Sequence, residues 1–568
     1  MEDQHKNINY LFKRLQRKYK AEEYIPVEQD CKKLKESCWL KLLLLNINIE
    51  SSLYKLILAI PKTFPYEYPS IYLHQEHANL IDLPHIDNNF FICTFDKSLS
   101  FSNIYKSLEV CEIVINRACK IINDGLTGKN HKDYEEEFLA YWYWANNICD
   151  GKVLSIVKPV NKAKDICIFD IKNLNFKKYK YLLADSLLNG MNWLLNTNIM
   201  KSETIINHNY GVYFPINIAA FNSVPRTNKE ILTFLQGNKL KDLFNHLNNK
   251  KRPTMVLCNY KNGMFAFELQ EYFDNIRKGK ESLKRKHQKG FRPGKQVTSL
   301  ELSGFAKDNK IKRYYVDRFD KERLFERGGE GLSINQQYKI NILGCGSIGS
   351  FLLEKLVQSG FNNFNLVDND IFCVENLARH VCDISDLGLC KVEALKEKMY
   401  KRYPLLNITT MNKNIISLAL NNLDIFNSSD LNIICVGDYN TEICLTKRLE
   451  NTIIKKPILI LWVEPYLKTG HFVYIDPNDI ISFEELHHFK SNNLVYKYSA
   501  NPMPNQEKKQ ETGCQSVYIP YGTLSISSFL NNVVCLIHEI ASKKITRSCI
   551  YRWQKGSSIM DSKMEKLL

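Results

Sequence analysis

The chain has 568 residues, of which 44% are hydrophobic and 24% are charged, values that are ordinary for a globular protein of several domains. They exclude a wholly disordered chain, a collagen-like fibre and a small disulfide-bonded scaffold. The net charge of +16 is unevenly placed, because residues 277–295 hold nine Lys or Arg against one Glu. We interpret that run as a solvated linker, and since no nucleic-acid-binding motif accompanies it, we expect no nucleic-acid partner.

The N-terminal residues include acids and no apolar stretch, so we predict no secretory signal. No apolar run approaches the roughly 20 residues of a membrane-spanning helix, and no membrane partner is expected. The 17 cysteines are spread over the chain, and no two of them stand three residues apart. We therefore predict reduced thiols in the cytoplasm, without a Cys-x-x-Cys zinc or redox motif.

Residues 1–130 are predicted to form an α+β domain. Segments 39–49 and 52–60 have the composition of strands, and prolines punctuate residues 61–69. Segments 7–22 and 102–122 favour helices, the second because its apolar residues recur at alternating steps of four and three. The expected order is helix, β-meander, irregular loop and helix.

Residues 131–325 are predicted to form a mixed α/β domain without a recognisable chemical motif. Strands are expected at 165–169, 211–215, 254–258 and 264–269, and helices at 182–195 and 229–248. We interpret the cluster at 141–144, with two Tyr and two Trp, as core or domain-packing surface rather than a stacking platform.

Residues 326–568 alternate strand and helix. Strands are expected at 338–343, 364–368 and 431–436, and helices at 347–359, 391–403 and 524–540. This alternation predicts a mostly parallel, Rossmann-like sheet that is covered on both faces.

A glycine motif, Gly344-Cys-Gly346-Ser-Ile-Gly349, follows the first of these strands and opens a helix. Glycine lets the backbone approach a phosphate closely, and the helix N-terminus supplies N–H donors, so the motif predicts a nucleotide site. Asp368 follows 24 residues after Gly344, a spacing that also fits an NAD-dependent oxidoreductase. A non-catalytic binding scaffold is a third possibility.

The residues beyond the glycine motif favour a triphosphate. Asp368 and Asp370 stand two apart at a strand end and can hold a ribose or a metal ion. Asn376 and Arg379 share a helical face, and Arg379 with Lys391 can neutralise phosphate charge. A nicotinamide site does not need this many cations, whereas a triphosphate that is attacked at its α-phosphate does.

Asp438 follows a later strand and can hold Mg²⁺ beside the phosphates. With it, the ordered set from Gly344 to Asp438 resembles the ThiF/MoeB/ubiquitin-activating family of adenylating enzymes. The resemblance implies ATP and Mg²⁺ as cofactors, bound by Gly344, Gly346, Gly349, Asp368, Asp370, Asn376, Arg379, Lys391 and, at the metal, Asp438.

Two further expectations come from this resemblance. Relatives use an arginine just before the first strand, for which Arg318, Arg323 and Arg327 are candidates. The Cys-x-x-Cys zinc site of many relatives is absent, so no structural zinc is expected.

Cys514 lies after a polar, proline-broken stretch and before the apolar segment 524–540. A cysteine ahead of a helix is accessible and can gain thiolate character, although most of the cysteines must be incidental core residues. The resemblance to thioester-forming relatives implies that Cys514 is the catalytic cysteine, which takes an acyl group from an adenylate.

The segment around Cys93 resembles a ubiquitin-conjugating domain over about residues 1–125. The resemblance is carried by a strand, the prolines of 64–69, then His85, and an Ile-Cys pair in a loop before helices. It implies that Cys93 receives the acyl group by thiol exchange.

His85 looks like the histidine of that family's His-Pro-Asn motif, which shapes the active-site loop, although a purely structural loop histidine fits equally well. Ile86 and Asp87 replace the Pro and Asn of the motif. Asn88 or Asn89 could therefore supply the oxyanion-stabilising amide.

The fold class expected for the whole chain is α/β multidomain, with a ubiquitin-conjugating-like domain (1–130), a degenerate adenylation-like or linker domain (131–325) and a ThiF-type adenylation domain (326–568). This order resembles bacterial fusions of ubiquitin-conjugating and ubiquitin-activating enzymes, of the kind that accompany CBASS anti-phage systems. The resemblance implies that the C-terminus of a cGAS/DncV-like nucleotidyltransferase or ubiquitin-like protein is activated and joined to a target amine, such as a lysine. It also implies a homodimer.

Overall fold

The structure is a computed structural model, and it describes most of the chain. The described residues are 2–81, 83–87, 89–95, 100, 102–144, 149–172, 174, 176, 178–200, 206–216, 225–235, 242–243, 246, 253–261, 263–268, 310–320, 323–324, 337–490, 493–499, 509–510, 517–518, 521–556 and 562–568. Cys514, Arg327, Asn88 and the basic run 277–295 lie outside them.

Backbone contacts divide the chain into two compact units. One comprises Met1–Gly190 with Ile205–Arg318, and the other comprises Met191–Thr204 with Phe319–Leu568. The expected mixed α/β, multidomain class is confirmed. The boundaries at 130 and 325 stay predictions.

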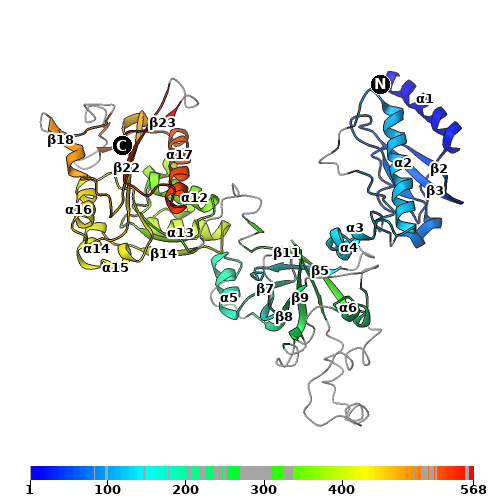
Figure 1. The fold of residues 1–568 in the computed structure, drawn as a ribbon, viewed down its shortest axis with the longest axis horizontal. Helices are drawn as coiled ribbons and strands as arrows, with labels where there is room; N and C mark the ends of the chain where they lie inside the picture. Colours follow the sequence, from blue (N-terminus) through cyan, green and yellow to red (C-terminus); the bar gives the residue numbers. More distant parts are fainter. Residues whose placement is uncertain are drawn as a thin grey trace, which may run out of the picture. The chain divides into compact units, whose positions relative to one another are not determined.

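The N-terminal part of the first unit is a four-stranded antiparallel meander with helices packed on it (Figure 1). Its elements are α1 (Glu2–Tyr19), β1 (Glu22–Glu23), β2 (Trp39–Ile49), β3 (Ser52–Pro61), β4 (Ser70–Leu73), η1 (Gln75–Leu80), α2 (Ser107–Leu126), α3 (His131–Glu136) and α4 (Phe138–Trp144). Leu11 and Leu15 of α1 and Val114 and Ala118 of α2 join the alternate buried residues of β2 and β3 in one core. The expected order of helix, meander, loop and helix is observed.

The rest of the first unit is a closed barrel of seven strands in the order β10-β11-β5-β7-β6-β8-β9. The elements from this part of the chain are β5 (Cys149–Ser155), β6 (Lys164–Asp170), β7 (Tyr181–Ala184), α5 (Leu187–Asn196), β8 (His208–Ile216), α6 (Asn228–Phe234), β9 (Pro253–Tyr260), β10 (Gly263–Glu268) and β11 (Lys312–Arg318). Parallel and antiparallel pairs are mixed around it. The suggested likeness of this region to an adenylation domain therefore rests on resemblance alone.

One prediction for this region is corrected and another agrees with the structure. The segment 182–195 was expected to be one helix, but its start belongs to strand β7, and α5 begins only at Leu187. Asp185 and Ser186 form the break, because the Asp185 carboxylate is drawn to Lys164 and the Ser186 hydroxyl caps the helix start at Asn189. The aromatic cluster on α4 is packed as predicted, with Trp142 fully buried beside Phe265 of β10.

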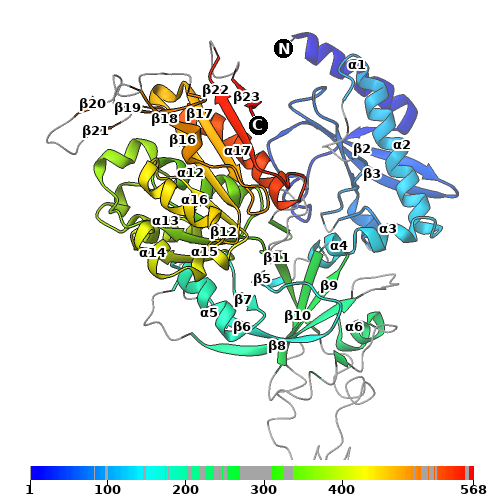
Figure 2. The ribbon, with the colours of Figure 1, turned by 60° about the vertical axis from the view of Figure 1, so that its left-hand side comes forward.

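The second unit contains an eight-stranded sheet in the order β14-β13-β12-β15-β16-β17-β22-β23, of which β14 to β16 are parallel (Figure 2). Its strands are β12 (Lys339–Leu343), β13 (Asn363–Val367), β14 (Asn407–Met411), β15 (Leu431–Ile434), β16 (Ile458–Val463), β17 (Thr469–Ile475), β22 (Cys549–Gln554) and β23 (Lys563–Lys566). The short pairs β18 (His487–Lys490) with β19 (Asn493–Tyr496) and β20 (Lys509–Gln510) with β21 (Val517–Tyr518) form separate ribbons.

Helices cover both faces of this sheet, as expected. One face packs against α12 (Ser347–Gln358), α13 (Lys391–Arg402) and α17 (Thr523–Ala541). The other packs against α14 (Ile415–Asn421), α15 (Asp424–Asn427) and α16 (Tyr439–Glu450), drawn in yellow in Figure 2. Short 3₁₀ turns η3 (Val374–Arg379), η4 (Ile384–Asp386), η5 (Pro465–Leu467) and η6 (Glu484–Leu486) lie in the connections.

Among the described residues, α17 is the one helix whose length and composition would allow it to cross a membrane. More than half of its apolar window, 56%, is buried inside the unit. Ile526, Phe529 and Val533 of α17 belong to the core that also contains α12 and the sheet, which is the environment of a core helix.

The packing of α17 gives a stability prediction. Leu530→Ala removes a fully buried side chain from this core, and we expect a loss of roughly 2–5 kcal/mol in the free energy of unfolding. Leu524→Ala on the same helix is the matched control, because Leu524 is 71% exposed and its loss should change stability by less than about 0.5 kcal/mol. Urea titration of both variants measures this, and equal losses would contradict the assignment of the buried face.

Candidate active site

The glycine motif forms a tight turn between β12 and α12. Gly344 has φ +94°, and a Cβ there would lie 2.7 Å from the Val436 side chain. A Cβ on Gly349 would lie 2.0 Å from the carbonyl oxygen of Gly344, so α12 can approach the turn only without a side chain. A Cβ on Gly346 would meet nothing within 4 Å. The first and last glycines thus shape the turn, and the middle one faces open space.

Asp368, which directly follows β13, fixes this turn. Its Oδ2 accepts a hydrogen bond from the Cys345 N–H at 2.6 Å, and its Oδ1 accepts one from the Asp370 N–H at 2.8 Å. The side chain is buried, with 8% exposure. Each carboxylate oxygen can accept a second hydrogen bond, so the predicted contact with ribose hydroxyls remains compatible with this geometry.

Lys391 and Asp370 form an ion pair at the start of α13. The Lys391 Nζ lies 2.7 Å from Asp370 Oδ2, and the side chains are 9% and 61% exposed, respectively. The backbone also joins them, since the Lys391 N–H donates to the Asp370 carbonyl. The predicted phosphate-binding cation is therefore buried and held by an exposed carboxylate two residues after Asp368.

Asn376 and Arg379 both lie on η3, where residues three apart share a face as predicted. The Asn376 Oδ1 accepts from the Cys373 N–H at 3.0 Å, which fixes the start of the turn. The Arg379 guanidinium lies over the Tyr521 ring at 5.5 Å from its centroid, and Thr523 Oγ1 donates to the Ala378 carbonyl at 3.0 Å. The predicted cationic turn is thus attached to the start of α17.

His380 is a site residue that the sequence did not single out. It is buried, its Nε2 lies 2.8 Å from the Cys345 carbonyl oxygen, and its Nδ1 accepts from the Cys382 N–H at 3.1 Å. The ring is therefore neutral with the proton on Nε2, consistent with burial, which lowers its pKa. His380 ties η3 to the glycine turn, and its position directly after Arg379 was the available signal.

Asp438 caps the N-terminus of α16 at the carboxyl end of β15. Its Oδ2 accepts from the N–H of Thr441 at 2.9 Å and from the Thr441 hydroxyl at 2.6 Å. The side chain is exposed, and no described residue donates to its Oδ1. Mg²⁺ is commonly held by one or two carboxylates together with substrate phosphates, so this hard oxygen donor fits the metal. The described residues contain no cluster of three or more His, Cys, Asp or Glu that could hold a metal alone.

Glu442 lies one turn beyond Asp438 on α16 and was also missed by the sequence reasoning. Its side chain is buried, and its Oε1 has no hydrogen-bond partner in the part of the chain that the structure describes. Burial and, after it, the charge of Asp438 raise the pKa of Glu442 to about 8. The Glu442 carboxyl is therefore mainly protonated at neutral pH.

These groups meet at one edge of the sheet. Gly344 and Asp368 directly follow the neighbouring parallel strands β12 and β13, and Gly437 lies three residues beyond the end of β15, the other neighbour of β12 in the sheet. The strand order reverses beside β12, and such a point forms the ligand crevice of open α/β sheets. The glycine turn, the Lys391 cation and the Asp438 carboxylate are thus brought together at the carboxyl edge.

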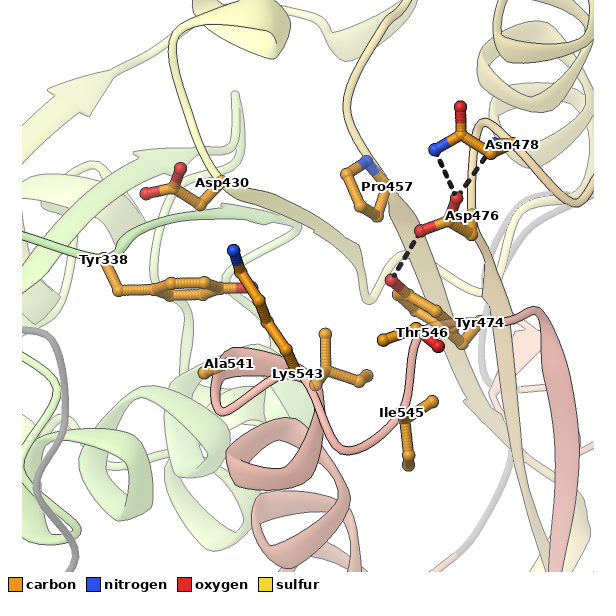
Figure 3. A pocket seen from close by; sticks show the side chains of 11 residues that line it. Tyr338, Asp430, Pro457, Tyr474, Asp476, Asn478, Ala541, Lys543, Ile545 and Thr546 are labelled. Atoms are coloured by element: carbon orange, nitrogen blue, oxygen red, sulfur yellow. Dashed lines mark hydrogen bonds between the residues drawn. The ribbon is translucent and has the colours of Figure 1, made fainter.

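A separate cavity of about 510 Å³ lies at the opposite edge of the same sheet (Figure 3). It is lined by residues that precede β12, β15 and β16, by the end of β17 and the residues after it, and by the end of α17 and the turn that follows: Tyr338, Asp430, Pro457, Tyr474, Asp476, Asn478, Ile540, Ala541, Lys543, Ile545 and Thr546. Its carboxylates already have partners, since Asp430 accepts from the Lys339 N–H and Asp476 accepts from Asn478. This cavity is not the nucleotide site.

Of the two predicted thiols, Cys93 is the one that the structure describes. Cys514 lies outside the described residues. Cys93 is half-buried, and its backbone N–H donates to the His85 carbonyl at 2.8 Å. Asp87, in place of the motif's Asn, accepts from the N–H groups of Asn89 and Phe91 and so closes its own turn. The exposed Asn89 and the undescribed Asn88 remain the candidates for the oxyanion amide.

The contacts of the candidate arginines do not distinguish which of them would reach ATP. Arg318 ends β11 in the first unit. The Arg323 N–H donates to Asp320 Oδ1 at 3.2 Å, and Arg327 is undescribed. Which of the three reaches ATP stays a prediction. The 15 cysteines whose side chains the structure describes are free thiols.

Comparison with known proteins agrees with both halves of this description. Residues 323–542 match the model of the ThiF family, and residues 21–149 match the model of prokaryotic E2 family B. One polypeptide thus contains a segment that matches the ThiF family and a segment that matches prokaryotic E2 family B, and the resemblance inferred from the sequence is confirmed.

Curated relatives of two kinds are similar to the chain. The ATP-dependent ubiquitin transferase-like protein Cap2 of Vibrio cholerae is 24% identical over 349 residues, which is 56% of this chain and 57% of that protein. The tRNA threonylcarbamoyladenosine dehydratase 1 of Saccharomyces cerevisiae is 34% identical over 113 residues, 18% of this chain and 26% of that protein. A probable molybdopterin-synthase adenylyltransferase of Porphyra purpurea is 32% identical, over 18% of this chain and 26% of its own length. The chain thus spans 57% of this Cap2 relative and 26% of each of the other two proteins.

Glu442 gives a pH-dependent prediction. Its folded pKa of about 8 exceeds its ordinary value of 4.5, so its contribution to stability is complete below pH 4.5 and is lost as the pH rises through 8. Gln stays neutral, and we expect the stability of Glu442→Gln relative to wild type to rise by roughly 2–4 kcal/mol between pH 5 and pH 8.5. Urea titrations at both pH values measure this, with the exposed Glu397→Gln as control. A difference that does not change with pH would contradict the buried, uncharged state.

Proposed function

We propose that the chain uses ATP to activate a protein C-terminal carboxylate as an acyl-adenylate and then transfers the acyl group through thioesters to an amine. The observation that carries this proposal is the pairing, within one chain, of an open glycine turn with Asp438 and Lys391 at one sheet edge and an E2-family domain bearing Cys93. The substrate's carboxylate would attack the α-phosphate, and pyrophosphate would leave.

The residues of the adenylating domain divide the work in this proposal. The backbone of Gly346 faces open space where a nucleotide can approach, and Asp368 keeps that turn in one shape. Arg379 and Lys391 would neutralise phosphate charge. Mg²⁺ at Asp438 would supply further charge neutralisation and orientation of the phosphates.

The acyl group would then pass to Cys514 and from there to Cys93. A thiolate attacks the activated carbonyl, and the thioester keeps the carboxylate activated after ATP has been used. A lysine amine would attack last, releasing Cys93. The Cap2 relatives are called ATP-dependent ubiquitin transferase-like, which supports an ATP-dependent transfer of this kind.

The substrate and assembly are proposed from the family resemblance. We infer the C-terminus of a cGAS/DncV-like nucleotidyltransferase, or a ubiquitin-like protein, as the activated group, within anti-phage defence in the cytoplasm. A homodimer is part of the same proposal. An NAD-dependent oxidoreductase is disfavoured, because a hydride-transferring site has no need of the buried Lys391 and the metal-accessible Asp438 together.

The adenylation half is tested at Asp438. Asp438→Asn removes the charge that would hold Mg²⁺ but keeps an oxygen able to cap α16, so the protein should fold and lose ATP–pyrophosphate exchange by about 100-fold or more. The matched control is Asp424→Asn, which changes an exposed acid in the first turn of α15. This variant should catalyse ATP–pyrophosphate exchange at the wild-type rate. Wild-type exchange by folded Asp438→Asn would show that the metal assignment is wrong.

The relay is tested by removing one thiol at a time. Because adenylation precedes thioester formation, Cys514→Ala should retain pyrophosphate exchange and lose every thioester. Cys93→Ala should retain the thioester at Cys514 and lose only transfer to an amine. Non-reducing gels of enzyme, ATP and candidate nucleotidyltransferase, with dithiothreitol as control, measure these adducts. A reducible adduct on Cys514→Ala would contradict the order, and normal conjugation by both variants would contradict the relay.

A further inference from the structure

The turn that carries Cys93 is held in place by His85. The Cys93 N–H donates to the His85 carbonyl at 2.8 Å, and Ile86 and Ile92 form an antiparallel bridge between the two residues. His85 has φ +64°, a conformation that a non-glycine residue adopts only when its surroundings enforce it. The direction of the backbone at Cys93 is therefore set by whatever holds His85.

Three side chains from α3, α4 and the residue between them hold His85. Its Nε2 lies 3.1 Å from Asp133 Oδ2, and its Nδ1 lies 3.1 Å from Glu137 Oε1. Tyr141 closes the network, since its hydroxyl accepts from the His85 backbone N–H at 2.7 Å and donates to Glu137 Oε2 at 2.6 Å. Two ionised carboxylates can only accept hydrogen bonds, so both ring nitrogens of His85 carry protons.

The charges in this network are mutually dependent. Hydrogen bonding to Glu137 raises the pKa of His85 against the opposing effect of burial, and Asp133 adds to the rise. Burial acts to raise the pKa of Glu137, but the hydrogen bonds from His85 and Tyr141 outweigh it and lower that pKa. The His85 contribution is complete below pH 6.5 and is lost as the pH rises through its folded pKa, whereas that of Glu137 is present above pH 4.5.

The other side of Cys93 is fixed independently. Arg117 of α2 donates to the Thr94 carbonyl at 3.1 Å and lies 4.2 Å from the centroid of the Phe95 ring. Phe95 in turn stacks on Tyr68 at 4.4 Å. Asp87, a described carboxylate near Cys93, accepts from the N–H groups of its own turn. Cys93 thus lies between the Arg117 contact, which does not involve His85, and the His85 contact, which depends on the charge of the His85 ring.

We propose that Asp133 and Glu137 are positioning residues for acyl transfer to Cys93, acting through the His85 imidazolium. In that transfer the Cys93 sulfur attacks a thioester carbonyl, the new C–S bond forms as the old one breaks, and the departing thiolate takes up the proton that Cys93 released. A sulfur displaced by a reoriented turn reaches the carbonyl less often. The inference rests on the proposed function of Cys93 as an acyl acceptor.

The test uses the full chain and a small probe, the thioester of acetylglycine with 2-mercaptoethanesulfonate. Mass spectrometry of the Cys93 peptide measures its acylation rate. We expect Glu137→Gln to be acylated about 10-fold more slowly than wild type at pH 6.5, because the network then holds a protonated His85. Well above the His85 pKa measured by the titration described below, the two rates should converge, since neutral His85 no longer needs either carboxylate. Glu136→Gln, which removes an exposed charge next to Glu137, is the matched control and should equal wild type throughout.

A second readout reports the network directly. NMR titration of labelled histidine, assigned with His85→Gln, should give a His85 pKa that is lower in Glu137→Gln than in wild type. Equal acylation by the Glu137 and Glu136 variants, or a defect of the same size at both pH values, would overturn the proposal. If Glu137→Gln does not fold, Asp133→Asn is held to the same criteria.

The probe also separates this inference from the proposed function. It bypasses ATP and Cys514, so absence of pyrophosphate exchange in the wild-type chain would overturn the adenylation proposal without affecting the His85 measurement. Failure of wild-type Cys93 to accept the acyl group would overturn both the role of Cys93 and the positioning role.

Discussion

The arrangement of the candidate nucleotide site depends on the two hydrogen bonds that the Asp368 carboxylate accepts. One oxygen holds the turn after β12 and the other holds the turn after β13, through the N–H groups of Cys345 and Asp370. Leaving either donor without a partner in this buried place would cost about 1–3 kcal/mol. Because Asp370 in turn pairs with Lys391, the position of the buried Lys391 ammonium group also depends on the Asp368 carboxylate. Gly349 completes the arrangement by letting α12 reach the Gly344 carbonyl.

The two domains fix their candidate reactive turns with histidines in opposite protonation states. His380 is neutral, because it must accept from one backbone N–H and donate to one carbonyl within a buried setting. His85 is protonated, because both of its ring nitrogens face carboxylates. A neutral ring makes the glycine turn insensitive to pH around neutrality, whereas a charged ring makes the Cys93 turn sensitive to it.

Local patterns predicted the parts of the fold that depend on neighbouring residues. The glycine turn, β12 and α12 follow from short sequence signals, and the structure has them where they were expected. Long-range pairings carry no such signal: β5 and β11 pair across about 160 residues of chain, and that pairing helps close the barrel. His85 and its carboxylates are likewise about 50 residues apart, with no periodicity to connect them. Short apolar runs were ambiguous between strand and helix, which is why β7 was included in a helix.

If the proposed relay runs through Cys514, the contacts between η3 and the start of α17 connect adenylation with loading of that thiol. Arg379 lies over Tyr521, seven residues beyond Cys514, and the Thr523 hydroxyl is bonded to the Ala378 carbonyl. A phosphate that draws Arg379 toward itself must therefore share the guanidinium with the Tyr521 ring. Thermodynamic linkage makes this coupling mutual. If nucleotide binding changes the preferred position of the chain after Cys514, then an acyl group on Cys514 changes the nucleotide affinity by the same factor. Acylation of Cys514 and release of the nucleotide would then be coupled through one conformational equilibrium.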